Sequence, residues 1–122
     1  MTQHQRAIVL FAHGSRDPQW SLPVQAVASQ VRARDPCVLV HCAYLEMMEP
    51  DLPCATRALV ASGASHVTVV PLFLGVGRHA RQDLPRLMAN LAQEHPQVHF
   101  DLQQAIGEDP RVISLLAEIA LS

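Results

Sequence analysis

The chain lacks the features that mark several common protein classes. Its three cysteines, Cys37, Cys42 and Cys54, are odd in number and include no Cys-x-x-Cys pair, which argues against a disulfide framework or a thiolate zinc site. We expect all three to be small buried hydrophobic residues. No apolar run is long enough for a membrane span, and no basic segment followed by an apolar one opens the chain, so a cytoplasmic location is predicted.

Basic segments are missing as well. The net charge of -2 and the pI near 6.3 come with no run or stripe of basic residues, which argues against nucleic-acid binding. The composition is instead apolar, with 49% hydrophobic residues among 122. A chain of this size can bury its core as one domain, residues 1–122, without disulfide or metal. An anionic ligand would therefore have to be met by local cations.

Short apolar runs alternate with stretches of helical periodicity. The runs predict strands at residues 7–11, 37–44, 67–73 and 98–102, of which the third is a central strand covered on both faces and the last a half-exposed edge strand. Acidic residues followed by proline predict helix starts at Asp17-Pro18, Glu49-Pro50-Asp51, Asp83-Leu84-Pro85 and Asp109-Pro110. Residues 75–82 are then a loop, and Gly63 is placed to cap a helix in the left-handed conformation.

The last predicted helix carries apolar residues at helical spacing, from which we expect a buried stripe made of Val112, Ile113, Leu116 and Ile119. Four strands alternating with four helices imply right-handed crossovers and a parallel sheet. The sequence therefore predicts an α/β fold, a three-layer flavodoxin-like sandwich with a four-stranded parallel sheet. The first and third strands should be neighbours, and ligands should bind beyond the carboxyl ends of the strands.

Chemically useful side chains follow these strands. His13 comes after the first, Glu46 after the second and His79 after the third, so all three should converge on one edge of the sheet. Neutral imidazoles can ligate a divalent cation or accept a proton near pH 7, and a carboxylate would complete such a site. We predict His13, Glu46 and His79 as catalytic residues.

The same loops hold groups suited to an anionic ligand. Arg16, Arg78 and Arg81 are placed to pair with carboxylates or phosphates, and backbone donors at Gly14 and Ser15 could bind an anion. We predict Ser15, Arg16, Arg78 and Arg81 as substrate-binding residues.

Taken together, the loop sequences resemble the short CbiX/SirB class of sirohydrochlorin chelatases. The resemblance spans almost the whole chain and rests on residues 13–16, 45–50, 71–79, 83–85 and 107–110. It implies a class II chelatase, one half of the longer two-domain members, that inserts cobalt(II), iron(II) or nickel(II) into sirohydrochlorin on the routes to cobalamin, sirohaem or coenzyme F430.

The resemblance also implies roles and partners. His13 and His79 would be metal ligands and proton acceptors, and Glu46 would relay protons. No permanently bound cofactor and no energy source are expected, because the divalent metal is a substrate. A chain of this length would act as a homodimer with the cavity between subunits. The histidine-rich segment of some cobalt-handling relatives is missing here, so the sequence does not identify the metal. Cobalt and iron are the metals more commonly assigned to the family, and we expect one of them.

Two other functions fit parts of the same pattern. A His-Gly pair after a first strand also occurs in phosphohistidine phosphotransferases, but those enzymes place arginine directly before the histidine, where this chain has Ala12. A metal or tetrapyrrole carrier that binds without turnover would use the same loops. Covalent phosphate on His13 would support the first alternative, and persistent metal binding without turnover the second.

Overall fold

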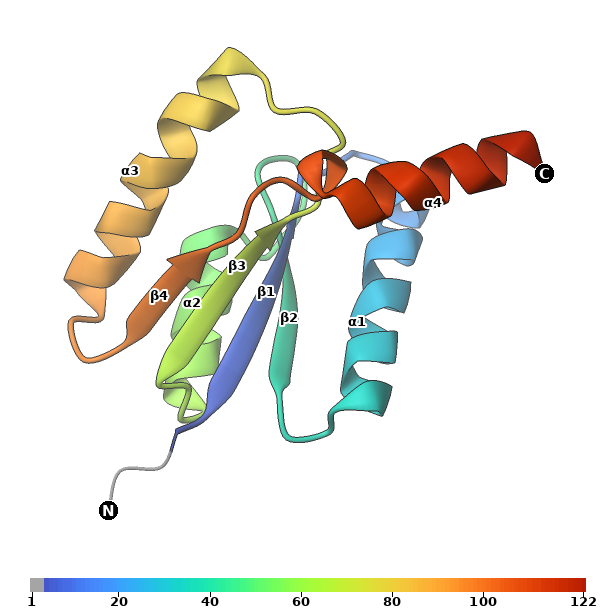
Figure 1. Cartoon of the computed structure of the whole chain (residues 1–122). Helices are drawn as coiled ribbons and strands as arrows, with labels where there is room; N and C mark the ends of the chain where they lie inside the picture. The colour runs from blue at the N-terminus through green and yellow to red at the C-terminus, as the bar shows by residue number, and fades with distance from the viewer. Residues whose placement is uncertain (1–3) are drawn as a thin grey trace.

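The computed structural model describes residues 4–122 and shows strands and helices that alternate along the chain (Figure 1). The strands are β1 (Arg6–Ala12), β2 (Leu39–Tyr44), β3 (His66–Pro71) and β4 (His99–Leu102). The α-helices are α1 (Leu22–Arg34), α2 (Leu52–Ala61), α3 (Arg78–Glu94) and α4 (Pro110–Leu121). Two short 3-10 helices, η1 (Pro18–Ser21) and η2 (Ile106–Glu108), precede α1 and α4. No helix within residues 4–122 is long and apolar enough to cross a membrane.

The four strands form one parallel sheet in the order β2-β1-β3-β4. β1 pairs with both β2 and β3, so the predicted adjacency of the first and third strands is confirmed. Helix α1 lies on one face of the sheet, and α2 and α3 lie on the other (Figure 1). This is the predicted three-layer α/β sandwich, in which the loops after the strands gather at one edge.

Two apolar clusters hold the layers together, one on each face of the sheet. The larger cluster includes Val9, Phe11, Leu59 and Leu91, which α2 and α3 cover. The smaller cluster lies under α1 and includes Leu10. Because the side chains of a strand point alternately to its two faces, Val9 and Leu10 belong to opposite clusters. β1 is thus covered on both faces, as expected for a central strand of a parallel sheet, whereas β3 is covered on the face of α2 and α3 and, toward its carboxyl end, on the other face as well.

Helix α3 begins earlier than the sequence pattern indicated. Residues 75–82 were expected to be a loop and Pro85 a first helical residue, but α3 starts at Arg78 and Pro85 lies inside it. Gly77 precedes the helix and provides no side-chain cap. A helix start is usually marked by a capping side chain, which Gly77 lacks. The sequence pattern therefore points to Asp83-Leu84-Pro85, further along the chain, as the helix start.

The apolar stripe of helix α4 was expected to be buried, but it is exposed. α4 starts at the predicted Asp109-Pro110, yet none of its residues is buried, and Ile113, Leu116 and Ile119 are 54%, 43% and 59% exposed. The helix extends away from the carboxyl end of the sheet (Figure 1). Within residues 4–122, its apolar face is therefore left largely exposed.

The prediction for the cysteines was wrong in two of three cases. Cys37 and Cys54 are exposed and Cys42 is partly buried. Cys37 lies in the turn before β2, outside the strand that was expected to include it, and Cys54 lies in the first turn of α2. By contrast Gly63 follows α2 with φ of +102°, which confirms the left-handed cap.

Candidate active site

The loops after β1 and β2 are joined side by side at the carboxyl edge of the sheet. The backbone N–H of Leu45 donates to the carbonyl oxygen of Ala12 at 2.9 Å, and that of Glu46 donates to His13 at 3.0 Å. The parallel pairing of the two strands thus continues past their ends. As a result, Glu46 is fixed opposite His13 although 33 positions separate them in the sequence.

Gly14 permits this close approach. It has φ of +103°, where residues with a side chain are strained, and a Cβ atom there would lie 1.9 Å from the carbonyl oxygen of Glu46. The residue after His13 therefore has to be glycine for both reasons. Met47, with φ of 67°, turns the second loop directly after Glu46.

His13 and Glu46 also contact each other through their side chains. The Nε2 atom of His13 lies 2.9 Å from Oε1 of Glu46, and the two side chains are 59% and 48% exposed. When the proton is on Nε2, the Nε2–H group donates a hydrogen bond to Glu46, and Nδ1 keeps a free lone pair. A carboxylate that orients an imidazole in this way is a common partner of histidines that bind metal or accept a proton.

His79 faces the same hollow from another element. It is the second residue of α3, so the first turn of a helix positions it. A hollow of about 230 Å³ is lined by both histidines, by Arg78 and by the apolar side chains of Leu45, Phe73 and Ala80. The structure thus brings together His13, His79 and, through its contact with His13, Glu46. Their catalytic roles stay predictions.

The loop between β3 and α3 is held in place by the segment before α4. Gly107 in η2 donates its backbone N–H to the carbonyl oxygen of Phe73 at 3.0 Å. A Cβ atom on Gly107 would lie 1.7 Å from the carbonyl oxygen of Leu74, so only glycine allows this packing. The loop before the last helix therefore supports the edge at which His79 lies.

The cations of this edge are all arginines. Arg16, Arg78 and Arg81 are exposed, and none of them takes part in an ion pair within residues 4–122. Their guanidinium groups are free to form paired hydrogen bonds with carboxylates. Arg78 and Arg81 lie in the first turn of α3, where the helix dipole adds to the positive field. Ser15 has a different contact, because its hydroxyl oxygen accepts the backbone N–H of Asp17 at 3.1 Å.

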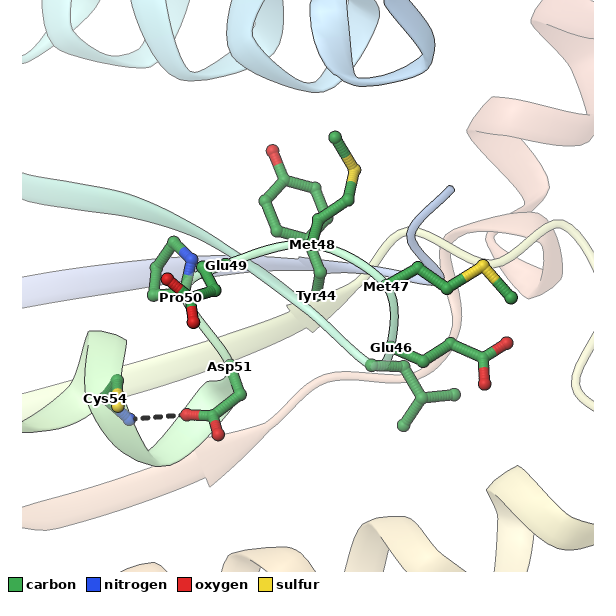
Figure 2. A pocket seen from close by; sticks show the side chains of 9 residues that line it. Tyr44, Glu46, Met47, Met48, Glu49, Pro50, Asp51 and Cys54 are labelled. Carbon is green, nitrogen blue, oxygen red and sulfur yellow. Dashed lines mark hydrogen bonds between the residues drawn. The ribbon is translucent and has the colours of Figure 1, made fainter. Parts of the chain in front are cut away.

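A second hollow of about 380 Å³ lies along the loop between β2 and α2 and shares Leu45 with the first. Figure 2 shows Glu46 and Met47 extending to one side of this loop, whereas Tyr44 and Met48 extend toward α1. The exposed thiol of Cys54 also lines it. The carboxylate of Asp51 raises the pKa of Cys54 by accepting its hydrogen bond, which disfavours the thiolate needed for metal binding.

Sequence reasoning missed the exposed apolar side chains at this edge. Leu45, Met47 and Leu74 are 38%, 58% and 70% exposed. They lie in the loops that follow β2 and β3, as Glu46 does, and offer a flat apolar ligand a contact surface. Their signal in the sequence was only their position after predicted strands, which also fits ordinary core residues.

Comparison with known proteins assigns the family. The CbiX family model matches residues 7–121. The chain belongs to the CbiX family. Its structure resembles that of a CbiX protein from Marinobacter aquaeolei VT8, with a TM-score of 0.81, 33% identity and coverage of 95% of this chain and 94% of that one. It also resembles the sirohydrochlorin chelatase SirB from Bacillus subtilis subspecies spizizenii in complex with cobalt, with a TM-score of 0.80 and 28% identity.

Relatives in sequence carry consistent names. The sirohydrochlorin ferrochelatase of Bacillus subtilis is 30% identical over 89% of this chain, which spans 42% of that protein. The sirohydrochlorin cobaltochelatases of Methanocaldococcus jannaschii and Sulfolobus acidocaldarius are 35% and 30% identical over 73% and 93% of this chain, which matches 62% and 88% of their lengths. The CbiX chain thus spans about half of the Bacillus proteins and most of the Sulfolobus one.

Proposed function

We propose that this CbiX chain is a chelatase that inserts a divalent metal into sirohydrochlorin, cobalt(II) or iron(II) in the first place and nickel(II) as the alternative. The observation that carries the proposal is that His13 and His79 line one hollow at the carboxyl edge of the sheet, while Glu46 contacts His13. The names of the relatives, which are cobaltochelatases and ferrochelatases, support the substrate. The pathway would be that of cobalamin or sirohaem.

The reaction needs two pyrrole protons removed and a hydrated cation stripped of water. Nitrogen ligands suit cobalt, iron and nickel better than magnesium, so His13 and His79 would hold the incoming ion on one side of the macrocycle. Glu46, 2.9 Å from His13, would stabilise the imidazolium that forms when His13 accepts a proton. Arg16, Arg78 and Arg81, which form no ion pair within residues 4–122, would bind the carboxylates of the substrate together with Ser15.

We further propose that the protein acts as a homodimer with the macrocycle between the subunits. The hollow at His13 and His79 has a volume of about 230 Å³, which is below the range of roughly 300–1,000 Å³ typical of complete ligand sites. The exposed apolar face of α4 needs a cover. A second copy would supply a further wall for the hollow and a cover for α4. In the longer Bacillus relatives, the second half of the chain would take the place of that copy. A single-domain, cytoplasmic protein remains our prediction.

The direct test is anaerobic absorbance of sirohydrochlorin with Co²⁺, Fe²⁺ or Ni²⁺, with and without the protein. We expect a metal-dependent acceleration over the non-enzymatic rate, and its size would rank the metals. Tight binding of metal and macrocycle without acceleration for any metal would instead support the carrier.

A further inference from the structure

Three metal-binding side chains lie together on the sheet, far from the edge just described. His66 opens β3 and pairs in register with His99, which opens β4. Asp101 lies two residues beyond His99 and therefore on the same face of the sheet. This is the face that α1 covers in part, because Leu10 and Val70 of the smaller cluster point the same way.

The three side chains already contact one another. Nε2 of His66 lies 2.7 Å from Oδ2 of Asp101, and Nε2 of His99 lies 3.3 Å from Oδ1 of the same carboxylate. The two imidazole rings have centroids 4.6 Å apart at an interplanar angle of 69°. One ligand atom from each residue lies within 4.8 Å of the other two.

These distances suit a first-row metal ion. Ligand atoms about 2.1 Å from a tetrahedral ion are about 3.4 Å apart, which is close to the 3.3 Å between His99 and Asp101 and longer than the 2.7 Å between His66 and Asp101. The carboxylate would therefore have to shift away from His66 to admit an ion in place of the shared proton. Two histidines and one carboxylate leave further positions open for water and suit iron, cobalt, nickel and zinc.

The cluster is also accessible and separate. The side chains of His66, His99 and Asp101 are 37%, 66% and 53% exposed, so an ion can reach them from solvent. His66 is the first residue of β3, and its six residues put the cluster about 17 Å from the carboxyl end of that strand. An ion bound here would not contact His13 or His79.

We propose that His66, His99 and Asp101 form a second divalent-metal site, which binds first-row transition ions at the amino ends of β3 and β4. The site rests on its own geometry and not on the proposed chelatase activity. Strand register places the three residues together, because His66 pairs with His99 across parallel strands and Asp101 lies two residues further on the same face.

The test is calorimetric titration of the full chain with Co²⁺ alone. The variant His13→Ala/His79→Ala removes the histidines of the carboxyl edge, and we expect it still to bind one Co²⁺ per chain with a change in visible absorbance. Adding His66→Ala/His99→Ala to it should weaken that binding by roughly 100-fold or more. Adding His41→Ala instead, a histidine of β2 outside the cluster, should change nothing.

A further variant guards against loss of folding. Asp101→Asn keeps the size of the side chain but removes its charge and replaces one of its two acceptor oxygens by an NH2 group, and it should weaken Co²⁺ binding by roughly 10-fold or more in the same background. Circular dichroism reports whether each variant is folded. The proposal is overturned when the His13→Ala/His79→Ala variant binds no Co²⁺, or when it binds equally well with and without Asp101→Asn. Sirohydrochlorin is absent from this experiment, so its outcome is separate from that of the chelatase test.

Discussion

Replacing Gly14 by alanine should separate Glu46 from His13. A Cβ atom at position 14 would lie 1.9 Å from the carbonyl oxygen of Glu46, whereas ordinary contact begins at 3.4 Å. The two loops would therefore have to move apart by about 1.5 Å if their packing is to return to normal density. The carbonyl that is displaced belongs to the residue whose carboxylate contacts His13.

The magnitude of the effect follows from two contributions. Alanine at the φ of +103° that Gly14 adopts costs about 1–2 kcal/mol relative to glycine. Displacing a packed neighbour costs about 1–3 kcal/mol more. We therefore expect the free energy of unfolding to fall by about 2–5 kcal/mol. A shift of about 1 Å in a catalytic pair lowers turnover by roughly 100-fold.

Gly63 provides a matched control for the backbone strain. It has nearly the same φ, +102°, but a Cβ atom there would have no neighbour within 4 Å. Gly63→Ala should therefore lower stability by about 1–2 kcal/mol and leave metal insertion unchanged. Urea unfolding and anaerobic insertion of metal into sirohydrochlorin measure the two effects. Equal turnover of Gly14→Ala and Gly63→Ala would refute the argument that Gly14 sets the position of Glu46.

Three further predictions concern the core, helix α4 and its cap. Leu59→Ala, at a residue 1% exposed, should lower the free energy of unfolding by about 2–5 kcal/mol in urea, and an unchanged midpoint would contradict the assigned core. Ile119→Glu should leave the fold intact but produce a monomer in sedimentation, because Ile119 is 59% exposed on α4; a stable dimer would remove α4 from the interface. Hydrogen bonds from Arg111 lower the pKa of Asp109 from 3.8 to about 2, so the stability that Asp109 gives is complete above pH 3.8 and is lost as the pH falls toward 2. In acid titrations followed by circular dichroism, Asp109→Asn should lack this step, and an identical profile would contradict the role of the ion pair.

The sheet and the convergence at its edge were predictable because their signals are local. Apolar runs bounded by proline and glycine marked all four strands, and parallel topology then required the loops after them to meet. In this way His13 and His79 could be placed at the same edge of the sheet from the sequence alone. The hydrogen bond between His13 and Glu46 could not, because it depends on Gly14 and on the turn at Met47.

Three expectations failed for physical reasons. The start of α3 carries no capping side chain, so the sequence pattern indicates a helix start near Pro85, which in fact lies inside α3. The stripe of α4 shows what the helix can bury but not which chain buries it. Cys37 and Cys54 are exposed because they lie in a turn and a first helical turn, and the general preference of cysteine for the core gives no information about such positions.

We propose above that His13 and His79 deliver the metal. The decisive measurement compares the rate of Co²⁺ insertion into sirohydrochlorin under anaerobic conditions for the unchanged protein, His13→Ala and His79→Ala. Both side chains are exposed, so neither variant should alter the fold or the proposed dimer. We predict that each single variant loses insertion to the non-enzymatic rate while circular dichroism and sedimentation stay unchanged. Turnover equal to that of the unchanged protein in both variants would show that neither histidine is needed to deliver the metal.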